Sequence, residues 1–310
     1  MGKKLNILLL AGSNGIPVLR EISKTDHKVI AVLAAPEKNT FTTMSSVAKK
    51  MGYEVWSAKL VKDPAFAEVI RHLEIDILFS VRTLYIVEEN VLEAPRIGAY
   101  NLHPSPLPQY AGRNTISWSL YRGETTHGVT VHRMRPKVDT GTIAYQEIFP
   151  IEDHDTALSI TKKCIRKGIP LLMKLLEDAS QDTDNIPQIE QDLTKREYFL
   201  KEIPNDGRML WSQSAKKIVN FVRACDFYPF PSPWGYPRAM YNNRSIQIVK
   251  AKKTGKSCQA PPGTIGNFEG SSAIIACADE WVLVETIING DERIAPIDFL
   301  KMGDRLENGI

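Results

Sequence analysis

Short apolar runs alternate with segments of helical periodicity in the first half of the chain, which is typical of buried strands joined by helices. The apolar runs predict strands at residues 6–11, 29–34, 54–56, 75–80 and 98–103. The periodic segments predict helices at residues 16–22, 45–51 and 64–73. Asp63 and Pro64 are expected to open the last helix, as its N-cap and first-turn residue. This alternation indicates an α/β fold, with a parallel sheet that carries helices on both faces.

The pattern changes after residue 127. Residues 128–134 and 143–151 predict two strands that flank the loop 135–142 as a hairpin-like pair, and a long amphipathic helix over 155–176 closes this domain. Residues 181–207 are polar and lack a sustained period, so we expect a linker that lies over a surface.

The last hundred residues predict a second, smaller domain. A helix is expected over 212–224, capped by Ser212 or Ser214. Short apolar segments with glycine turns follow, at residues 245–249, 263–268, 273–277 and 281–285. They favour a small OB-like β-barrel. The predicted organisation is therefore an α/β domain at 1–180, a linker at 181–207 and a β-barrel-like domain at 208–310.

Composition places the chain among globular proteins and excludes several special classes. It has 310 residues, 43% of them hydrophobic and 24% charged, and no apolar run approaches the roughly 18–20 residues of a membrane helix. Residues 7–11 are too short for a signal sequence and are better explained as a first strand, so we expect a cytoplasmic protein. The four cysteines have no CxxC spacing, and no metal or redox site is expected.

The charge pattern gives little sign of a nucleic-acid surface. The net charge is +3, and one cluster of lysines stands out, at residues 250, 252, 253 and 256. A nucleic-acid footprint is usually stronger than this, so we interpret the cluster as a solvated loop.

The turn after the first predicted strand is a candidate substrate contact. Gly12 and Gly15 are spaced Gly-x-x-Gly, which does not match the GxGxxG fingerprint of dinucleotide-binding proteins. Two interpretations remain, a tight strand-to-helix turn, or a loop whose amides contact an anionic substrate at the helix N-terminus. In the second case Gly12, Ser13 and Asn14 are the candidate substrate-binding residues.

The strongest chemical signal lies at the end of the predicted strand 98–103. Asn101 and His103 are two residues apart, so on a strand their side chains point to the same face. An amide can donate to a developing oxyanion, and an imidazole can move a proton near neutral pH. Asp139, in a separate loop that ends at Gly141, could orient the imidazole. These are the groups needed to move an acyl group between nitrogens.

Two motifs carry a resemblance to a known family. Residues 101–108 (NLHPSPLP) and 127–141 (HGVTVHRMRPKVDTG) resemble the formyltransferases that use 10-formyltetrahydrofolate. Residues 1–180 look like the family's Rossmann-like catalytic domain. Residues 208–310 look like the C-terminal barrel of methionyl-tRNA formyltransferase and of the bacterial 4-amino-4-deoxyarabinose formyltransferase.

The resemblance implies roles for particular residues. Asn101 and His103 would hold the formyl oxygen, and Asp139 would orient the imidazole and help to pass on the proton of the attacking amine, with no metal needed. Two loops would bind the pterin of 10-formyltetrahydrofolate, with Leu84 and Ile86 as apolar contacts or as ordinary core. The candidate cofactor-binding residues are Arg82, Thr83, Leu84, Tyr85, Ile86, Arg135, Val138 and Gly141.

The chain departs from the family pattern next to the first motif. Ser105-Pro106-Leu107-Pro108 stands where many relatives have Ser-Leu-Leu-Pro, and Tyr110-Ala111-Gly112-Arg113 stands where they often have Tyr-Arg-Gly. Ser105 and Arg113 are therefore the candidate acceptor contacts, Arg113 as a substitute for the arginine missing from the motif.

The resemblance leaves several acceptors open. The segment 35–44 is short, with a single lysine, whereas methionyl-tRNA formyltransferases carry a basic inserted loop there. Residues 114–120 and 131–134 are closer to the amino-arabinose enzyme, so a nucleotide-linked 4-amino sugar or comparable small amine is the predicted acceptor. Initiator tRNA and hydroxyornithine are the alternatives within the family.

Other classes and the second domain also stay open. Hydrolysis of formyltetrahydrofolate and a binding module without transfer activity are the competing functions; the intact Asn101, His103 and Asp139 argue against the module. Residues 228–237 are rich in aromatics and prolines, and we favour a packed joint between domains over a binding lip. The barrel could also support a homodimer.

Overall fold

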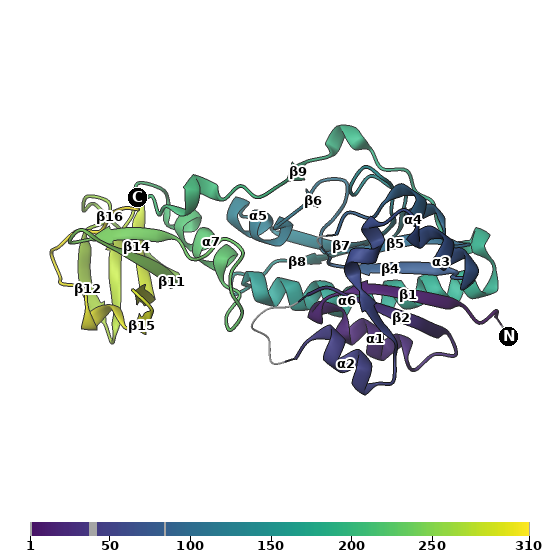
Figure 1. Cartoon of the computed structure of the whole chain (residues 1–310). Helices are drawn as coiled ribbons and strands as arrows, with labels where there is room; N and C mark the ends of the chain where they lie inside the picture. Colours follow the sequence, from purple (N-terminus) through teal and green to yellow (C-terminus); the bar gives the residue numbers. More distant parts are fainter. Residues whose placement is uncertain (1, 37–41, 84, 310) are drawn as a thin grey trace. The chain divides into compact units, whose positions relative to one another are not determined.

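The computed structural model describes residues 2–36, 42–83 and 85–309, and the chain forms two compact units (Figure 1). The first unit comprises Met1–Gly112, His127–Phe149 and Lys162–Tyr198. The second comprises Arg113–Thr126, Pro150–Thr161 and Phe199–Ile310. Within the described residues, no helix has the length and apolar character that crossing a membrane requires.

A mixed sheet forms the centre of the first unit, in the strand order β3-β2-β1-β4-β5-β7-β8. The first five strands of this order are parallel, as the alternating pattern predicts, but β7 runs antiparallel to β5. The strands are β1 (Asn6–Ala11), β2 (Lys28–Ala34), β3 (Val55–Ser57), β4 (Ile77–Val81), β5 (Gly98–His103), β7 (Thr126–Arg133) and β8 (Ile143–Pro150). β7 and β8 are neighbours in the sheet, which confirms the expected pair.

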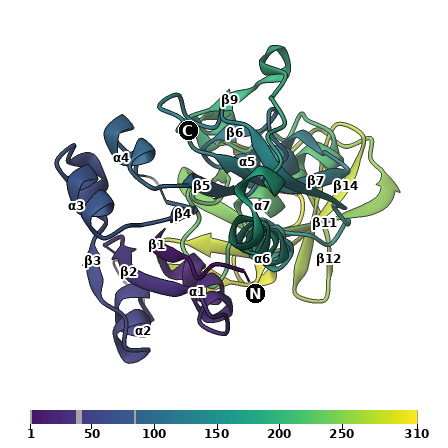
Figure 2. The same cartoon turned by 90° about the vertical axis from the view of Figure 1, so that its right-hand side faces the viewer.

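Helices cover both faces of this sheet (Figure 2). Leu8 and Leu78 pack in one core cluster with the apolar side chains of α3 and α4. On the opposite face Leu102 of β5 meets α6 at Gly168, where an added Cβ would lie 2.7 Å from the leucine. The helices are α1 (Ile16–Ile22), α2 (Met44–Lys50), α3 (Phe66–His72), α4 (Glu89–Glu93) and α6 (Ala157–Gln181).

The start of α3 differs from the sequence prediction. The N-cap is Ala65 rather than Asp63, and the Asp63 carboxylate accepts the Ala65 N–H at 3.0 Å. Asp63 and Pro64 therefore form a turn before the helix, because the Asp63 carboxylate accepts the N–H of Ala65, two residues further along the chain.

The segment predicted as a linker carries short elements and is bonded to the first unit. Ile143 and Ile189 exchange two backbone hydrogen bonds of 2.8 and 3.0 Å, and the Ala111 N–H donates to the Glu197 carbonyl at 2.9 Å. Its short elements are β9 (Tyr198–Phe199), which pairs with β6 (Ala111–Gly112), and the 3-10 turns Thr183–Asn185, Leu193–Lys195 and Pro204–Gly207. The expected domain boundaries at residues 180 and 208 stay a prediction.

The second unit is built on an antiparallel sheet in the order β12-β13-β14-β11-β10-β16, with β15 paired to β14. The Leu306 N–H donates to the Gly263 carbonyl and the Ile265 N–H to the Asp304 carbonyl, both at 2.8 Å, so the two ends of the sheet meet. This closure makes a small barrel. The strands are β10 (Arg238–Tyr241), β11 (Arg244–Ser257), β12 (Ile265–Glu269), β13 (Ser272–Ala276), β14 (Glu280–Asn289), β15 (Glu292–Ile294) and β16 (Glu307–Asn308).

Two helices belong to the second unit, α5 (Thr115–Arg122) and α7 (Ala215–Cys225). Ser214 caps α7 by accepting the Lys217 N–H, as one of the two expected caps. Trp118 of α5 packs against Trp234 and Phe199, with ring centroids 5.1 Å apart in both pairs. Within the segment 228–237, Trp234 is therefore packed, whereas Tyr228 and Phe230 are more than half exposed.

The lysine cluster lies on β11, so its interpretation as a loop is wrong. Lys250 and Lys252 form ion pairs with Glu285 of the neighbouring strand β14, at 3.2 and 2.7 Å. Lys256 pairs with Glu269 at 2.8 Å. Cross-strand pairing keeps this polar stretch in the sheet and offsets its positive charge.

Candidate active site

The antiparallel pairing of β5 and β7 sets the first contact of the site. It places His132 directly opposite Asn101, with 3.2 Å between Asn101 Nδ2 and His132 Nε2. His132 Nδ1 lies 2.9 Å from the Arg133 carbonyl, which fixes the proton on Nδ1. His132 Nε2 therefore accepts from the Asn101 amide. His132 is a site residue that the sequence does not reveal, because only the register of β5 and β7 brings it to Asn101.

His103 is buried at the end of β5 with both ring nitrogens directed at acceptors. Nε2 donates to the Tyr110 carbonyl at 2.7 Å, and Nδ1 lies 3.6 Å from Asp139 Oδ2. Burial lowers the pKa of His103, while the charge of Asp139 and the Tyr110 carbonyl act in the opposite direction. The neutral imidazole thus has an unprotonated Nδ1 beside a carboxylate, a position in which it can take up a proton.

Asp139 completes the cluster from the loop between β7 and β8. Its Oδ2 accepts the Gly112 N–H at 2.8 Å, and its Oδ1 lies 3.4 Å from His132 Nε2. Burial alone would raise the pKa of Asp139, but the neighbouring His103 and the Gly112 amide hold it well below its usual range. The carboxylate is therefore charged at neutral pH, although the residue is only 8% exposed.

The cluster joins an amide donor to a proton-accepting pair. Asn101 gives one N–H to His132, and its second N–H can donate to a carbonyl oxygen on which charge develops. His103 and Asp139 can share a proton released next to them. The structure thus brings together the three residues that the sequence identifies as catalytic candidates, and adds His132 to them.

A buried network fixes the proline-rich loop after His103. The Thr130 hydroxyl donates to the Ser105 carbonyl at 2.7 Å, and Gln146 donates to the Leu107 carbonyl at 2.9 Å. Ser105 is fully buried, and its hydroxyl donates to the Pro104 carbonyl at 2.6 Å. These contacts show Ser105 in the support of the loop, and its assignment to the acceptor stays a prediction.

His127 supports the same loop and makes stability depend on pH. Its Nε2 donates to the Pro104 carbonyl at 2.9 Å, and burial lowers the pKa of His127 to about 4. Between that value and the unfolded pKa of about 6.5, the unfolded chain binds a proton that the folded chain excludes. The free energy of unfolding should therefore fall by about 2–4 kcal/mol as pH drops through this window.

We expect His127→Gln to remove this part of the pH dependence, because the Gln amide can still donate to the Pro104 carbonyl but does not titrate. Urea unfolding at pH 7 and at pH 4 measures how much the free energy of unfolding changes with pH in each protein. His154→Gln, at an exposed position, is the matched control. An equal loss of stability on acidification in wild type and His127→Gln would contradict the assignment.

The first predicted cofactor loop follows β4. Arg82 has a left-handed backbone (φ 52°), and its Nη1 atom is buried without a hydrogen-bond partner among the described residues. Burial raises the pKa of the nearby Cys164 thiol to about 12, so this cysteine is an unreactive neighbour of the guanidinium. Ile86 is 64% exposed and is not core, whereas Tyr85 packs against a core cluster.

The rest of this loop and the second one are less constrained. Thr83 Oγ1 lies 3.3 Å from Ser80 Oγ, and Leu84 lies outside the described residues. In the second loop Arg135 is exposed and pairs with Glu190 at 3.3 Å. Val138 is half-buried and Gly141 touches the Arg133 carbonyl, where an added Cβ would lie at 1.8 Å. A glycine is therefore required there, and cofactor binding by these residues stays a prediction.

The turn after β1 is tight. Gly12 precedes the 3-10 turn Ser13–Gly15, and a Cβ on Gly15 would lie 2.4 Å from that of Ala11. This geometry accounts for Gly15 by packing, and substrate contact by Gly12, Ser13 and Asn14 stays a prediction. Arg113 belongs to the second unit, where its N–H donates to the Phe199 carbonyl at 2.8 Å, and its role stays a prediction too.

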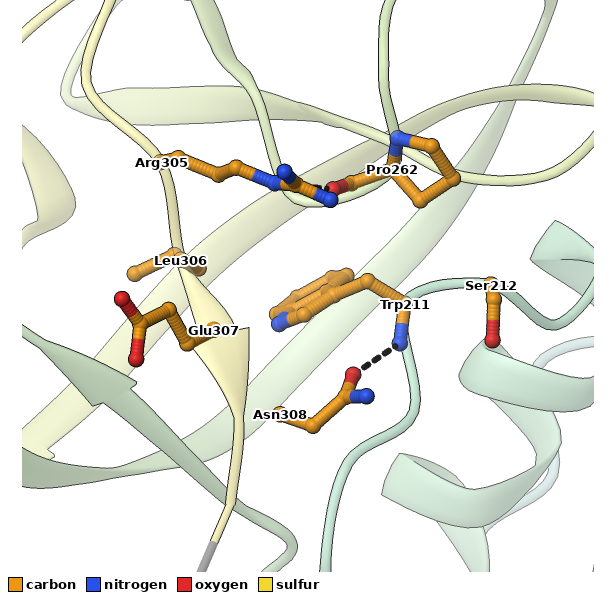
Figure 3. A pocket seen from close by; sticks show the side chains of 7 residues that line it. All are labelled: Trp211, Ser212, Pro262, Arg305, Leu306, Glu307 and Asn308. Atoms are coloured by element: carbon orange, nitrogen blue, oxygen red, sulfur yellow. Dashed lines mark hydrogen bonds between the residues drawn. The ribbon is translucent and has the colours of Figure 1, made fainter.

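A pocket of about 380 Å³ lies in the second unit (Figure 3). Trp211 is one of its lining residues, but it is only 1% exposed and offers almost no surface to a ligand. Its backbone N–H donates to the Asn308 side chain at 3.1 Å, and Arg305 donates to the Pro262 carbonyl at 2.8 Å. The lining groups thus hold the end of the chain in place, and the candidate catalytic residues lie together in the first unit.

Comparison with known proteins identifies the family of this chain. The family model described as formyl transferase matches residues 5–176, and the model of the formyl transferase C-terminal domain matches residues 202–303. A bifunctional polymyxin resistance protein, ArnA, of Wigglesworthia glossinidia brevipalpis is 34% identical over 259 residues, which cover 82% of this chain. The chain spans only 38% of the length of that relative.

Solved structures share the fold. WlaRD, a sugar 3N-formyl transferase crystallised in the presence of dTDP and 5-N-formyl-THF, superposes with a TM-score of 0.69 at 22% identity, over 91% of this chain and 98% of that one. An N-formyltransferase of Helicobacter canadensis, in complex with folinic acid and dTDP-3-aminofucose, gives 0.69 at 23% identity over the same shares. HypX of Aquifex aeolicus gives 0.67 at 16% identity, over 94% of this chain and 48% of HypX.

Proposed function

Since this chain belongs to the formyl transferase family, we propose that it moves the formyl group of 10-formyltetrahydrofolate to a primary amine. The observation that carries the proposal is the buried cluster of Asn101, His103 and Asp139, which joins an amide donor to a carboxylate–imidazole pair. The folate is the donor in this proposal because two structures of the same fold were solved with formylated folates.

The chemistry follows from the positions of these groups. A neutral amine attacks the formyl carbon, and the carbonyl electron pair moves to the oxygen, where the second N–H of Asn101 stabilises the negative charge. Asp139 and His103 accept the proton that the attacking nitrogen loses. The bond from the formyl carbon to N10 of the folate then breaks, N10 takes a proton, and tetrahydrofolate leaves. The net reaction exchanges one N–C bond for another and needs no oxidant.

We propose a nucleotide-linked amino sugar as the acceptor. The N-formyltransferase of Helicobacter canadensis was solved with a dTDP-aminosugar, and the lysines of β11 are paired with glutamates rather than open to phosphates. Transfer to initiator tRNA would need more unpaired cationic side chains than this strand offers. A cytoplasmic location and a homodimer stay predictions.

An acceptor competition tests the proposal. The protein is mixed with 10-formyltetrahydrofolate and, separately, with dTDP- and UDP-linked amino sugars, charged initiator tRNA, hydroxyornithine or no acceptor. We expect tetrahydrofolate release, with one formyl group gained per folate, only with a nucleotide amino sugar. Release with tRNA or hydroxyornithine alone would overturn the acceptor class, and equal release without any acceptor would show a hydrolase.

A further inference from the structure

Asp139 holds an unusual backbone conformation. Its φ of 55° is left-handed, a region that non-glycine residues seldom occupy because the Cβ crowds the following carbonyl. This conformation turns the carboxylate toward the Gly112 N–H and the two imidazoles. Such strain persists only where surrounding contacts over-determine it.

A side chain from the segment predicted as a linker supplies these contacts. Gln191 Nε2 donates to the carbonyl of Asp139 itself at 3.1 Å and to that of Gly141 at 2.7 Å. Gln191 is 9% exposed, so both bonds are sheltered from water. Its Oε1 is buried without a hydrogen-bond partner among the described residues. Among the described residues, the Gln191 side chain therefore acts as a hydrogen-bond donor through its two N–H groups.

The surrounding residues 186–197, which we call the strap, hold the same loop and its neighbour. Arg196 donates to the Val138 carbonyl at 2.9 Å, just before Asp139. The Glu197 carbonyl accepts the Ala111 N–H at 2.9 Å, one residue before Gly112, whose own N–H reaches the Asp139 carboxylate. The strap thus bridges the two loops that meet at the carboxylate.

We propose that Gln191 is a positioning residue for Asp139: its amide fixes the left-handed backbone and thereby the distances from the carboxylate to Gly112, His103 and His132. The proposal rests on the proposed function for its effect on turnover. Its effect on the carboxylate itself is independent of that function. Nothing in the resemblance or in the comparisons assigns a role to Gln191.

Gln191→Met is the informative variant, because methionine has a similar length and loses only the two donors. We expect kcat for formyl transfer to fall about 10–100-fold, while KM for both substrates changes less than about threefold. The acid limb of the pH–rate profile should move upward. Without the Gln191 hydrogen bonds, the Asp139 carboxylate moves away from the groups that lower its pKa. Burial then raises the pKa of Asp139, because the lowering contacts are weaker.

Gln188→Met is the matched control, since Gln188 is an exposed glutamine of the same strap. A role in general stability would lower the melting temperature of Gln191→Met but leave its pH profile and its kcat per folded molecule unchanged. That result would overturn the proposal, as would equal behaviour of the two variants.

A second measurement separates this proposal from the proposed function. Carbon-13 labelling of the aspartate carboxyl groups allows Asp139 to be titrated by NMR, with Asp139→Asn assigning its signal. We expect the Asp139 carboxyl to take up a proton at a higher pH in Gln191→Met than in wild type, and to behave as in wild type in Gln188→Met. A shift without formyl transfer in wild type would refute the proposed function alone, and an unshifted signal would refute the role of Gln191.

Discussion

Asp139→Asn should lower kcat for formyl transfer by about 10²–10⁴-fold, with little change in KM. Asparagine keeps the shape of the side chain, and its carbonyl oxygen can still accept the Gly112 N–H that now bonds Oδ2 at 2.8 Å. The substituted amide cannot take up a proton and places no negative charge beside His103. Only the proton-accepting function is lost, because the main structural contact survives.

The loss is best measured in single turnovers at saturating folate and acceptor, across pH 6 to 9. Asp184→Asn, the same exchange at an exposed position of the first unit, is the control. If Asp139→Asn retained more than about a third of wild-type turnover, Asp139 would not be the proton acceptor, and water or the acceptor itself would have to fill that role. Wild-type affinity for 5-formyltetrahydrofolate in the variant would show that the folate site is intact.

The apolar strands were predictable because each is specified locally. β1 and β5 have the predicted bounds, since both are apolar runs buried on two sides. α5 was missed because threonine, serine and tryptophan are weak helix formers, and the packing of Trp118 against Trp234 and the burial of Ile116 and Leu120 stabilise this helix instead. β11 was predicted as five residues and extends over fourteen. Its lysines are typical of a loop in the sequence, and only the ion pair with Glu285 of the neighbouring strand explains why they continue the strand.

The candidate site divides in the same way. The spacing of Asn101 and His103 on one strand is a local signal, and it predicts that both side chains point to the same face of the sheet. The contact of His132 depends on the register of β5 and β7. β5 pairs in parallel with β4 and antiparallel with β7, and nothing in the sequence marks this change of direction. Gln191 lies 52 positions from Asp139 in a polar segment without a period. Its role depends on a side chain meeting a distant backbone carbonyl, and no pattern of polarity encodes such a contact.

His132 fixes the orientation of the Asn101 amide. His132 carries its proton on Nδ1, held by the Arg133 carbonyl, so its Nε2 can only accept from the Asn101 amide. This fixes the Asn101 side chain with its NH₂ group toward the cluster and prevents the flipped arrangement, in which the amide oxygen would face the incoming formyl group. A histidine outside the proposed chemistry thus determines which end of the amide meets the substrate.

Asn101→Ala should accordingly lower kcat by about 10²–10³-fold, or about 3–4 kcal/mol of transition-state stabilisation. The effect should appear in kcat rather than in KM, because the N–H bond strengthens only as charge develops on the formyl oxygen. Affinity for 5-formyltetrahydrofolate should change less than about threefold, since the folate ring does not depend on this amide. Asn90→Ala, at an exposed position of α4, is the matched control.

His132→Ala adds a test of orientation to the same experiment. It removes the acceptor that fixes the Asn101 amide but leaves the amide in place, so its loss should be smaller than that of Asn101→Ala, about 10-fold. The double variant should be no slower than Asn101→Ala alone, because His132 acts on the oxyanion only through Asn101. Additive losses would instead show that His132 takes part in proton transfer by itself, through its 3.4 Å approach to Asp139. Full turnover in Asn101→Ala would contradict the assignment of this amide as the oxyanion donor, and neutral His103 could not replace it because its N–H is donated to the Tyr110 carbonyl.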